Sequence, residues 1–255
     1  MDIFHRSFEQ EITVCPLGDI HIEHDCDIKR LEKDLEEIEK NGYYTLLIGD
    51  IFDVGFLNNI KDLKAHGDLN TAMEATKRLL NPIKDRILGM VDGNHDIRVS
   101  KAIGFDIIRE LASDLNIPYS SGQAILDLHI GNRGKNKRVG RYAYSIALIH
   151  GWGGGRTAGA KANKITQFAD MWEGIDLFVM GHVHSPMSMP SARYIFDSRT
   201  GSFRMREIRS IVLGAYQNYT LYAEQIALKP SPTLKYLIKL ASNEKNIEIT
   251  ERSTA

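Results

Sequence analysis

The chain has 255 residues, of which 43% are hydrophobic and 25% charged, the balance of an ordinary soluble globular protein. A formal net charge of −1 provides no global attraction to nucleic acid or to a membrane surface, and no apolar run approaches the roughly 20 residues that span a bilayer. Two cysteines, Cys15 and Cys26, exclude a disulfide framework and favour the reducing cytoplasm. Residues 1–8 also lack the apolar core that a signal peptide needs.

Five short apolar segments along the chain predict buried strands, and polar residues follow each of them directly. The fifth, residues 177–180, leads into Gly181 and then into two histidines separated by one residue, which point to the same face in extended backbone. Ligands bind at the carboxyl ends of strands in α/β sheets, so we expect these polar residues to form one site. The residues in question are Asp19, His21, Asp50, Asp53, Asn94, His95, Asp96, His150, His182 and His184.

Between these segments, apolar periodicity predicts helical regions at 29–40, 56–86 and 97–116. The second should break near His66 and Gly67 and stop near Asn81 and Pro82. A hairpin of strands 124–130 and 141–149 and a helix at 160–172 come next, and further strands are expected at 190–197, 203–213, 233–240 and 245–251. This order predicts one domain, residues 1–255, with two stacked sheets and helices outside them.

Seven of the polar residues are candidate metal ligands. Oxygen and imidazole donors without a thiolate suit Mn, Fe, Zn or Ni. Seven ligands are too many for one ion but fit two ions that share a carboxylate, and Asp50 is the natural bridge. Two ions about 3.5–4 Å apart can activate a shared hydroxide and stabilise the attacking and leaving oxygens of a displacement at phosphorus. The seven are Asp19, His21, Asp50, Asn94, His150, His182 and His184.

The alternative interpretation is that the nine histidines are scattered core or loop residues. It is disfavoured because five of the nine directly follow apolar strands, namely His21, His95, His150, His182 and His184. His24 and Asp25 lie just past the first motif and are expected in a solvated loop.

The five blocks D-x-H, G-D-x-x-D, G-N-H-D, H and G-H-x-H occur in this order over residues 18–184. They resemble the calcineurin-like metallophosphoesterase superfamily. The resemblance implies an α/β fold, a four-layer α/β/β/α sandwich of two mixed sheets flanked by helices, with a dinuclear metal centre at one rim of the sheets.

The same resemblance implies a role for each residue. One divalent ion would be held by Asp19, His21, Asp50 and His184, and the other by Asp50, Asn94, His150 and His182. His95 would be the catalytic residue that contacts the phosphate and protonates the leaving oxygen. Asp53 and Asp96 would orient imidazoles without binding metal.

At two positions the sequence differs from the pattern of phosphoprotein phosphatases, and these differences indicate which branch of the superfamily it resembles most. Phosphoprotein phosphatases have Arg after the second block and Glu after G-N-H, where this chain has Val54 and Asp96. This argues against a protein-serine phosphatase and favours the phosphodiesterase and nuclease branches. The Gly-rich stretch 151–159 with Arg156, followed by Lys161 and Lys164, resembles small phosphoesterases often encoded by phages and prophages.

We therefore expect a metal-dependent phosphodiesterase that hydrolyses a nucleotide or nucleic-acid phosphodiester through a metal-bridging hydroxide, with manganese as the first candidate ion. The alternatives are a phosphomonoesterase acting on a small nucleotide and a catalytically silent binding scaffold. The basic loop 133–141 either attracts a polyanion or is a solvated hairpin tip. Arg156 is the preferred substrate contact, because a guanidinium can grip phosphate oxygens with two hydrogen bonds. No membrane partner is expected.

Overall fold

The computed structural model describes residues 1–22, 26–53, 69–131, 141–219, 224 and 229–253. Expectations that fall on other residues lie outside the described part of the chain, including the helix break near His66, the loop at His24 and most of the basic loop 133–141. None of the described helices is long and apolar enough to cross a membrane.

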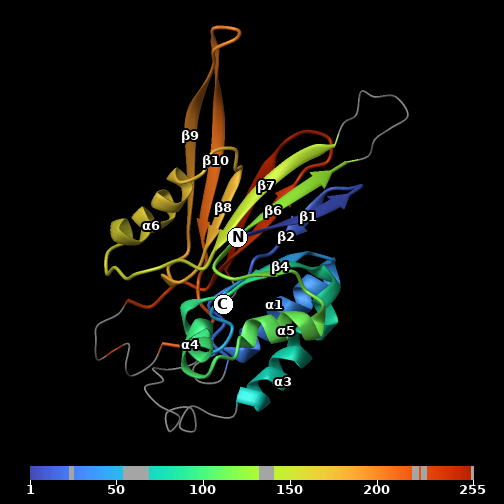
Figure 1. The fold of residues 1–255 in the computed structure, drawn as a ribbon, viewed down its shortest axis with the longest axis vertical. Helices are drawn as coiled ribbons and strands as arrows, with labels where there is room; N and C mark the ends of the chain where they lie inside the picture. The colour runs from blue at the N-terminus through green and yellow to red at the C-terminus, as the bar shows by residue number, and fades with distance from the viewer. Residues whose placement is uncertain (23–25, 54–68, 132–140, 220–223, 225–228, 254–255) are drawn as a thin grey trace.

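The first sheet has six strands in the order β1-β6-β7-β8-β10-β9 (Figure 1). β6 and β7 pair antiparallel, as do β9 and β10, whereas the other neighbours are parallel. The sheet is therefore mixed. The strands are β1 Asp2–Phe8, β6 Gln123–Ile130, β7 Tyr142–Ile149, β8 Leu177–Met180, β9 Met187–Asp197 and β10 Ser202–Val212.

The second sheet layer consists of two three-stranded groups, β12-β11-β2 and β3-β4-β5. Parallel bridges between Val14 and Tyr44 and between Leu17 and Leu47 join the groups, so that β2 lies beside β3. This layer is also mixed, because β11 runs antiparallel to both β12 and β2 while β3, β4 and β5 are parallel. Its strands are β2 Ile12–Val14, β3 Thr45–Ile48, β4 Ile87–Val91, β5 Tyr119–Ser120, β11 Leu234–Leu240 and β12 Ile247–Ser253.

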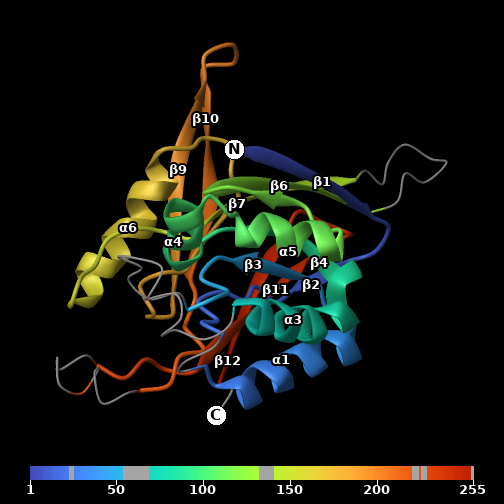
Figure 2. The ribbon, with the colours of Figure 1, turned by 60° about the horizontal axis from the view of Figure 1, so that its bottom comes forward.

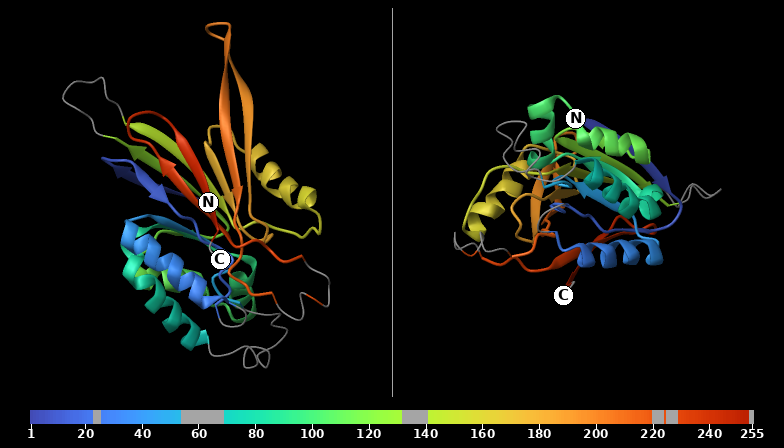
Figure 3. Two further views of the ribbon diagram at one scale, coloured as in Figure 1. Left: turned by 180° about the vertical axis from the view of Figure 1, so that it is seen from behind. Right: turned by 90° about the horizontal axis from the view of Figure 1, so that it is seen from below.

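The two sheets pack face to face and helices cover their outer faces (Figures 2 and 3). A core that includes Val14, Leu46, Leu126 and Ile146 fills the space between the sheets. Helix α6 covers the first sheet through Ile165 and other residues, and the remaining helices pack on the second. The expected four-layer α/β/β/α sandwich is confirmed. The helices are α1 Ile28–Asn41, α3 Leu69–Leu80, the 3-10 helix η1 Asn81–Arg86, α4 Asn94–Ile103, α5 Ile107–Leu115 and α6 Ala158–Asp170.

The structure differs from the sequence expectation at 97–116, where one helix was predicted and two are present. Gly104, in left-handed backbone with φ of 71°, ends α4. Asp106 then begins α5, its side chain accepting a hydrogen bond from the backbone N–H of Arg109. Gly104 therefore ends one helix and Asp106, two residues later, begins the next. Strand β1, at residues 2–8, was not anticipated.

Candidate functional site

The site is formed by loops that leave the carboxyl ends of strands in both sheets. Asp50 follows β3 and Asn94 follows β4 in the second layer, whereas His150 follows β7 and His182 follows β8 in the first. Because β7 is parallel to β8 and β3 is parallel to β4, these ends meet at one rim of the sandwich.

Left-handed backbone is concentrated in these loops. Six non-glycine residues of the described chain have positive φ, and all but Asn116 belong to the candidate ligand set. An L-residue pays a steric cost in this region, so the surrounding contacts must hold these residues there. The φ values are 50° for Asp19, 55° for His21, 48° for Asp50, 68° for His182 and 47° for His184.

One cluster of donors contains Asp19, His21 and His184. His184 Nε2 lies 3.2 Å from Asp19 Oδ1 and 3.3 Å from His21 Nε2. One donor atom from each of the three lies within 4.8 Å of the others. Asp19 and His21 are buried, whereas the side chain of His184 is 31% exposed and faces the rim.

A second cluster contains Asp50, His150 and His182, with Asn94 beside them. His150 Nε2 lies 3.1 Å from Asp50 Oδ2, 3.1 Å from Asn94 Oδ1 and 3.3 Å from His182 Nδ1. Asp50 Oδ2 is also 4.0 Å from His21 Nε2 of the first cluster. The buried Asp50 carboxylate therefore lies between the two clusters.

Two of the imidazoles form a hydrogen bond with a backbone carbonyl through one ring nitrogen, which shows that the other nitrogen faces the site. His150 Nδ1 lies 2.9 Å from the carbonyl oxygen of Ile48, and His182 Nε2 lies 2.6 Å from that of Gly153. A carbonyl can only accept, so each of these nitrogens carries its proton and the other nitrogen of each neutral ring presents a lone pair.

The residues fit two divalent cations. Two buried carboxylates and imidazole lone pairs converge, and such a set is costly to bury without a positive charge between its members. His21 Nδ1 is buried without a hydrogen-bond partner in the described structure, and Asp53 Oδ1 lies 3.7 Å from it. Mixed oxygen and nitrogen donors suit Mn, Fe, Zn or Ni.

The electrostatics of the clusters agree with this fit. Burial raises the pKa of Asp50, but the hydrogen bond and charge of His150 outweigh it and hold the pKa below its usual range. Asp19 behaves in the same way, with His184 outweighing burial to lower its pKa. Burial lowers the pKa of His150, but the Asp50 carboxylate raises it to about 9. The site therefore favours positive charge beside two ionised carboxylates.

His95 lies at the edge of the clusters, on the first turn of α4. Its backbone N–H donates to Asp50 Oδ1 at 2.8 Å. Its Nδ1 lies 3.0 Å from Asp53 Oδ1, which leaves Nε2 directed toward Asp50 Oδ2 at 4.0 Å. Burial raises the pKa of Asp53, but the neighbouring imidazoles of His21 and His95 outweigh it and hold the pKa well below its usual range, so this carboxylate is ionised.

Asp96 was expected to orient an imidazole, but its contacts in the structure are with backbone. It accepts hydrogen bonds from the N–H groups of Gly93 at 2.9 Å and Phe52 at 3.1 Å. Burial raises its pKa to about 7. Asp96 thus ties the loop that carries Asp50 to the loop that carries Asn94.

Two glycines allow the loops to approach each other. A Cβ on Gly181 would lie 2.5 Å from Asp19 Oδ2, and one on Gly93 would overlap the Asp50 carboxylate. The close approach lets the backbone N–H of His182 donate to Asp19 Oδ2 at 2.9 Å. No local pattern around Gly181 indicates that its close neighbour would be the Asp19 carboxylate.

Three basic side chains lie in or near the loops of the site, and they differ in how closely they approach the donor clusters. Arg156, the expected substrate contact, is exposed and makes no hydrogen bond or ion pair with any described residue. Lys161 lies closer to the ligands, because its Nζ donates to Ser185 Oγ at 2.6 Å, next to His184. Arg98, which the sequence analysis missed, lies 3.1 Å from His95 Nδ1. Its position three residues after His95 on a helix was the available signal.

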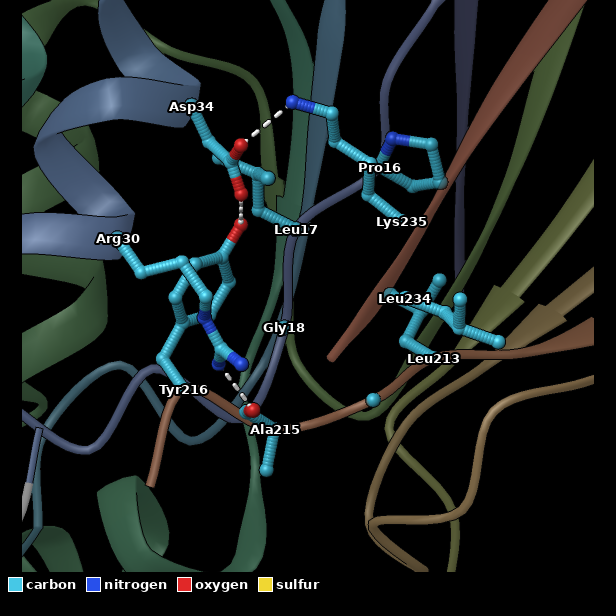
Figure 4. Close-up of a pocket in the computed structure, with 11 residues that line it drawn as sticks. Pro16, Leu17, Gly18, Arg30, Asp34, Leu213, Ala215, Tyr216, Leu234 and Lys235 are labelled. Carbon is cyan, nitrogen blue, oxygen red and sulfur yellow. Dashed lines mark hydrogen bonds and ion pairs between the residues drawn. The ribbon is translucent and has the colours of Figure 1, made fainter. Parts of the chain in front are cut away.

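A buried charged network supports the segment that carries Asp19 (Figure 4). Tyr216 donates its hydroxyl to Asp34 Oδ2 at 2.7 Å, and Lys235 Nζ donates to Asp34 Oδ1 at 2.5 Å. Arg30 lies over the Tyr216 ring, 4.4 Å from its centroid. The backbone N–H of Tyr216 donates to the Asp19 carbonyl at 2.9 Å, so the network holds the strand end in place.

Comparison with known families supports the chemistry that this geometry suggests. The model of the calcineurin-like phosphoesterase family matches residues 12–186, more than half of the chain. The chain belongs to this family. It is accordingly a metal-dependent phosphoesterase, and the matched range contains both donor clusters and His95. A comparison with curated protein sequences gave no match.

The solved structures that match this chain share little sequence identity with it. A Streptococcus pneumoniae protein described as a predicted phosphoesterase is 12% identical, with a TM-score of 0.39, covering 95% of this chain and 98% of its own. GAP50, described as the anchor in the inner membrane complex of Plasmodium, is 12% identical, with a TM-score of 0.48 and coverage of 96% and 85%. A hypothetical protein from Thermus thermophilus is 10% identical, with a TM-score of 0.40 and coverage of 95% and 99%.

Proposed function

We propose that this phosphoesterase hydrolyses a phosphodiester of a nucleotide or nucleic acid, using two divalent ions with manganese as the first candidate. The observation that carries the proposal is the position of the Asp50 carboxylate, 3.1 Å from His150 Nε2 and 4.0 Å from His21 Nε2 and His95 Nε2. A carboxylate between two donor clusters is suited to bridging two cations.

The donor clusters support a division of the ligands. Asp19, His21 and His184, together with Asp50, would hold one ion. Asp50, His150, His182 and Asn94 would hold the other. When bound, such ions supply Lewis acidity at the phosphoryl oxygens and an activated water at neutral pH. The neutral amide of Asn94 fits this second set because its oxygen faces His150 Nε2.

His95 is suited to contact the phosphate and to protonate the leaving oxygen. Its side chain is 23% exposed, so a substrate at the rim can reach the Nε2 edge. The Asp53 carboxylate, 3.0 Å from Nδ1, fixes the ring with Nε2 toward Asp50. Asp53 and Asp96 would thus act through other groups, Asp53 on imidazoles and Asp96 on the loops.

We propose that several cations contact the rest of the substrate. Arg156 remains our proposed phosphate contact, and Lys161 joins it because Ser185 holds its ammonium beside His184. Arg141, the described residue of the basic segment 133–141, precedes β7 and lies at the end of that strand opposite His150. The eight residues of β7 separate Arg141 from His150, so the two lie about 30 Å apart along the extended strand. Only an extended substrate such as a nucleic acid strand would reach both.

A phosphomonoesterase acting on a small nucleotide uses the same site and is the second candidate, favoured if loop 133–141 has no effect. A silent scaffold is disfavoured, because every expected ligand of the two ions is present and Asp50, Asn94 and His182 converge on His150 Nε2. The cytoplasm remains the proposed location, which suits two free cysteines, Cys15 and Cys26.

The test is metal-dependent turnover. Protein stripped with a chelator should be inactive on bis-(p-nitrophenyl) phosphate and recover with Mn²⁺. A panel of single-stranded DNA, duplex DNA, RNA, cyclic nucleotides and nucleotide monoesters at two salt concentrations then separates substrate classes. A strand substrate should show a steep salt dependence, because each neutralised phosphate releases counterions. Failure to turn over any phosphate ester with any of Mn, Fe, Zn or Ni would refute the proposal.

A further inference from the structure

The β9–β10 hairpin extends far beyond the sheet to which it belongs (Figures 1 and 3). β10 pairs with β9 along its whole length, from Ser202 to Val212. It pairs with β8 only from Arg209 to Val212. The outer part, Tyr194–Asp197 with Ser202–Met205, is therefore a two-stranded ribbon with both edges open. Such a ribbon is marginally stable alone in water.

One face of this ribbon carries four large apolar side chains. Phe203 pairs with Phe196 and Met205 pairs with Tyr194, so all four point to the same side. They are 71%, 67%, 59% and 75% exposed, respectively. The rings of Tyr194 and Phe203 also contact each other, with centroids 5.6 Å apart. We refer to Tyr194, Phe196, Phe203 and Met205 as the ribbon patch.

The ribbon patch continues the buried inner face of the first sheet. Ile211, on the same face of β10, lies in the core between the two sheets. Further out, no described residue of the second sheet covers this face. The opposite face is occupied near its base, where Arg193 binds Asp170 at the end of α6 and Arg206 binds Asp176. The patch is thus an inner sheet face that lacks its covering layer.

We propose that the ribbon patch packs against the ribbon patch of a second copy of this chain, forming a two-fold symmetric dimer. Aromatic side chains of this size bury about 150–250 Å² each, so the patch offers roughly 500 Å² per copy. A pair would bury about 1,000 Å², the size at which specific interfaces begin. Two sheet faces stacked in this way lie about 10 Å apart, as in a sandwich.

The chemistry of the patch favours a copy of itself over a polyanion. Within the fully described hairpin, the charged residues on this face are Glu207 and Arg209, which pair with each other at 3.2 Å. A nucleic-acid surface would place unpaired cations beside the aromatic rings. An uncharged apolar face is self-complementary, as a two-fold interface requires.

Size-exclusion chromatography with light scattering on the full-length protein tests the proposal. Wild type should have twice the chain mass of 28.8 kDa and dissociate on dilution over a roughly 100-fold concentration range. Phe203→Glu should raise the dimer dissociation constant at least about 100-fold, because it places two like charges in one apolar interface. Met171→Glu is the matched control: Met171 is 64% exposed but lies outside the hairpin, so the dimer should persist.

Phe203→Thr, which keeps strand propensity, replaces the glutamate variant if circular dichroism shows that the latter is misfolded. A monomeric wild type at the highest concentration would overturn the proposal, as would a dimer that survives the substitution at Phe203 in a correctly folded variant. A monomeric wild type that binds phosphatidylcholine–phosphatidylglycerol vesicles or single-stranded DNA, and loses this binding with Phe203→Glu, would also overturn it and assign the patch to that partner. The hairpin tip lies at the end of the sheet opposite the donor clusters, so metal-dependent activity should be the same in every variant.

Discussion

His150 Nε2 and His182 Nδ1 face each other at 3.3 Å, and the N–H on the other nitrogen of each ring donates to a backbone carbonyl. When both rings are neutral in these tautomers, their lone pairs face the same point, as two ligands of one metal ion would. A metal ion bound there would replace the proton that the Asp50 carboxylate favours on His150, whose pKa it raises to about 9.

The first prediction concerns this pair. His182→Ala should reduce the bound metal from two ions to one, because it removes a donor from the cluster with Asp50 while leaving Asp19, His21 and His184 intact. Metal content after dialysis, measured by mass spectrometry, checks the outcome. His129→Ala, which changes a histidine outside the site, should retain both ions. Two ions retained in His182→Ala would exclude His182 as a ligand.

The second prediction concerns the bridge. Asp50→Asn should abolish turnover and weaken both ions together, because the amide removes the charge that lies between the two clusters. Competition with a fluorescent chelator gives the two affinities. Asp127→Asn is the matched control, since Asp127 pairs with His5 and His129 and should leave both affinities unchanged. Loss of only one ion would show that Asp50 belongs to a single cluster.

The third prediction separates proton transfer from metal binding. His95→Ala should keep both ions and slow turnover about 10²–10⁴-fold, the range for loss of a general acid. Asp53→Asn should have a smaller effect of about 10–100-fold, because it loosens the rings of His95 and His21 without removing either. A leaving group of low pKa needs no protonation and should recover most of the rate in His95→Ala. Metal loss in His95→Ala would move this residue into the ligand set.

The fourth prediction tests the close approach of backbone to carboxylate. Gly181→Ala places a Cβ 2.5 Å from Asp19 Oδ2, so Asp19 must move away from His184. Metal affinity should fall at least about 10-fold while the far-ultraviolet circular dichroism stays that of wild type. Gly154→Ala is the control, because a Cβ there meets nothing within 4 Å. An unchanged affinity in Gly181→Ala would show that the loop has room to adjust.

The fifth prediction concerns stability. Lys235→Met leaves the Asp34 carboxylate buried with only Tyr216 as a described side-chain partner, and should lower the free energy of unfolding by about 3–5 kcal/mol. Burial lowers the pKa of Lys235, but Asp34 and Glu37 raise it above 10.5. The stabilisation is therefore fully present below pH 10.5 and is lost as the pH rises through the folded pKa. Urea unfolding of wild type and Lys235→Met should thus converge in strongly alkaline solution, and a constant difference would contradict this.

Much of the arrangement could be predicted from the sequence because its signals are local. Each apolar run ends at a polar residue, and the rule that ligands bind at strand carboxyl ends brings Asp50 and His150 together without knowledge of the sheet order. The hairpin at 124–149 and helix α1 followed in the same way from periodicity.

The features that the sequence did not predict depend on distant contacts. Strand β1 is mostly exposed and has no clear apolar periodicity, and it pairs with β6 as a parallel neighbour more than 100 residues away in the sequence. The position of Arg98 beside the site depends on its contact with the ring of His95. The role of Asp96 depends on its hydrogen bonds with the backbone N–H groups of Phe52 and Gly93. The exposed length of β10 depends on where β8 stops, which no pattern within β10 records.

The left-handed backbone of the ligand loops links metal binding to local order. Each L-residue in this conformation costs on the order of 1 kcal/mol, so the five ligands together store about 5 kcal/mol. That is comparable to the net stability of a whole domain. Amide hydrogens in these loops should therefore exchange slowly while the ions are bound and much faster once they leave, so metal occupancy can be followed in this protein by hydrogen exchange alone.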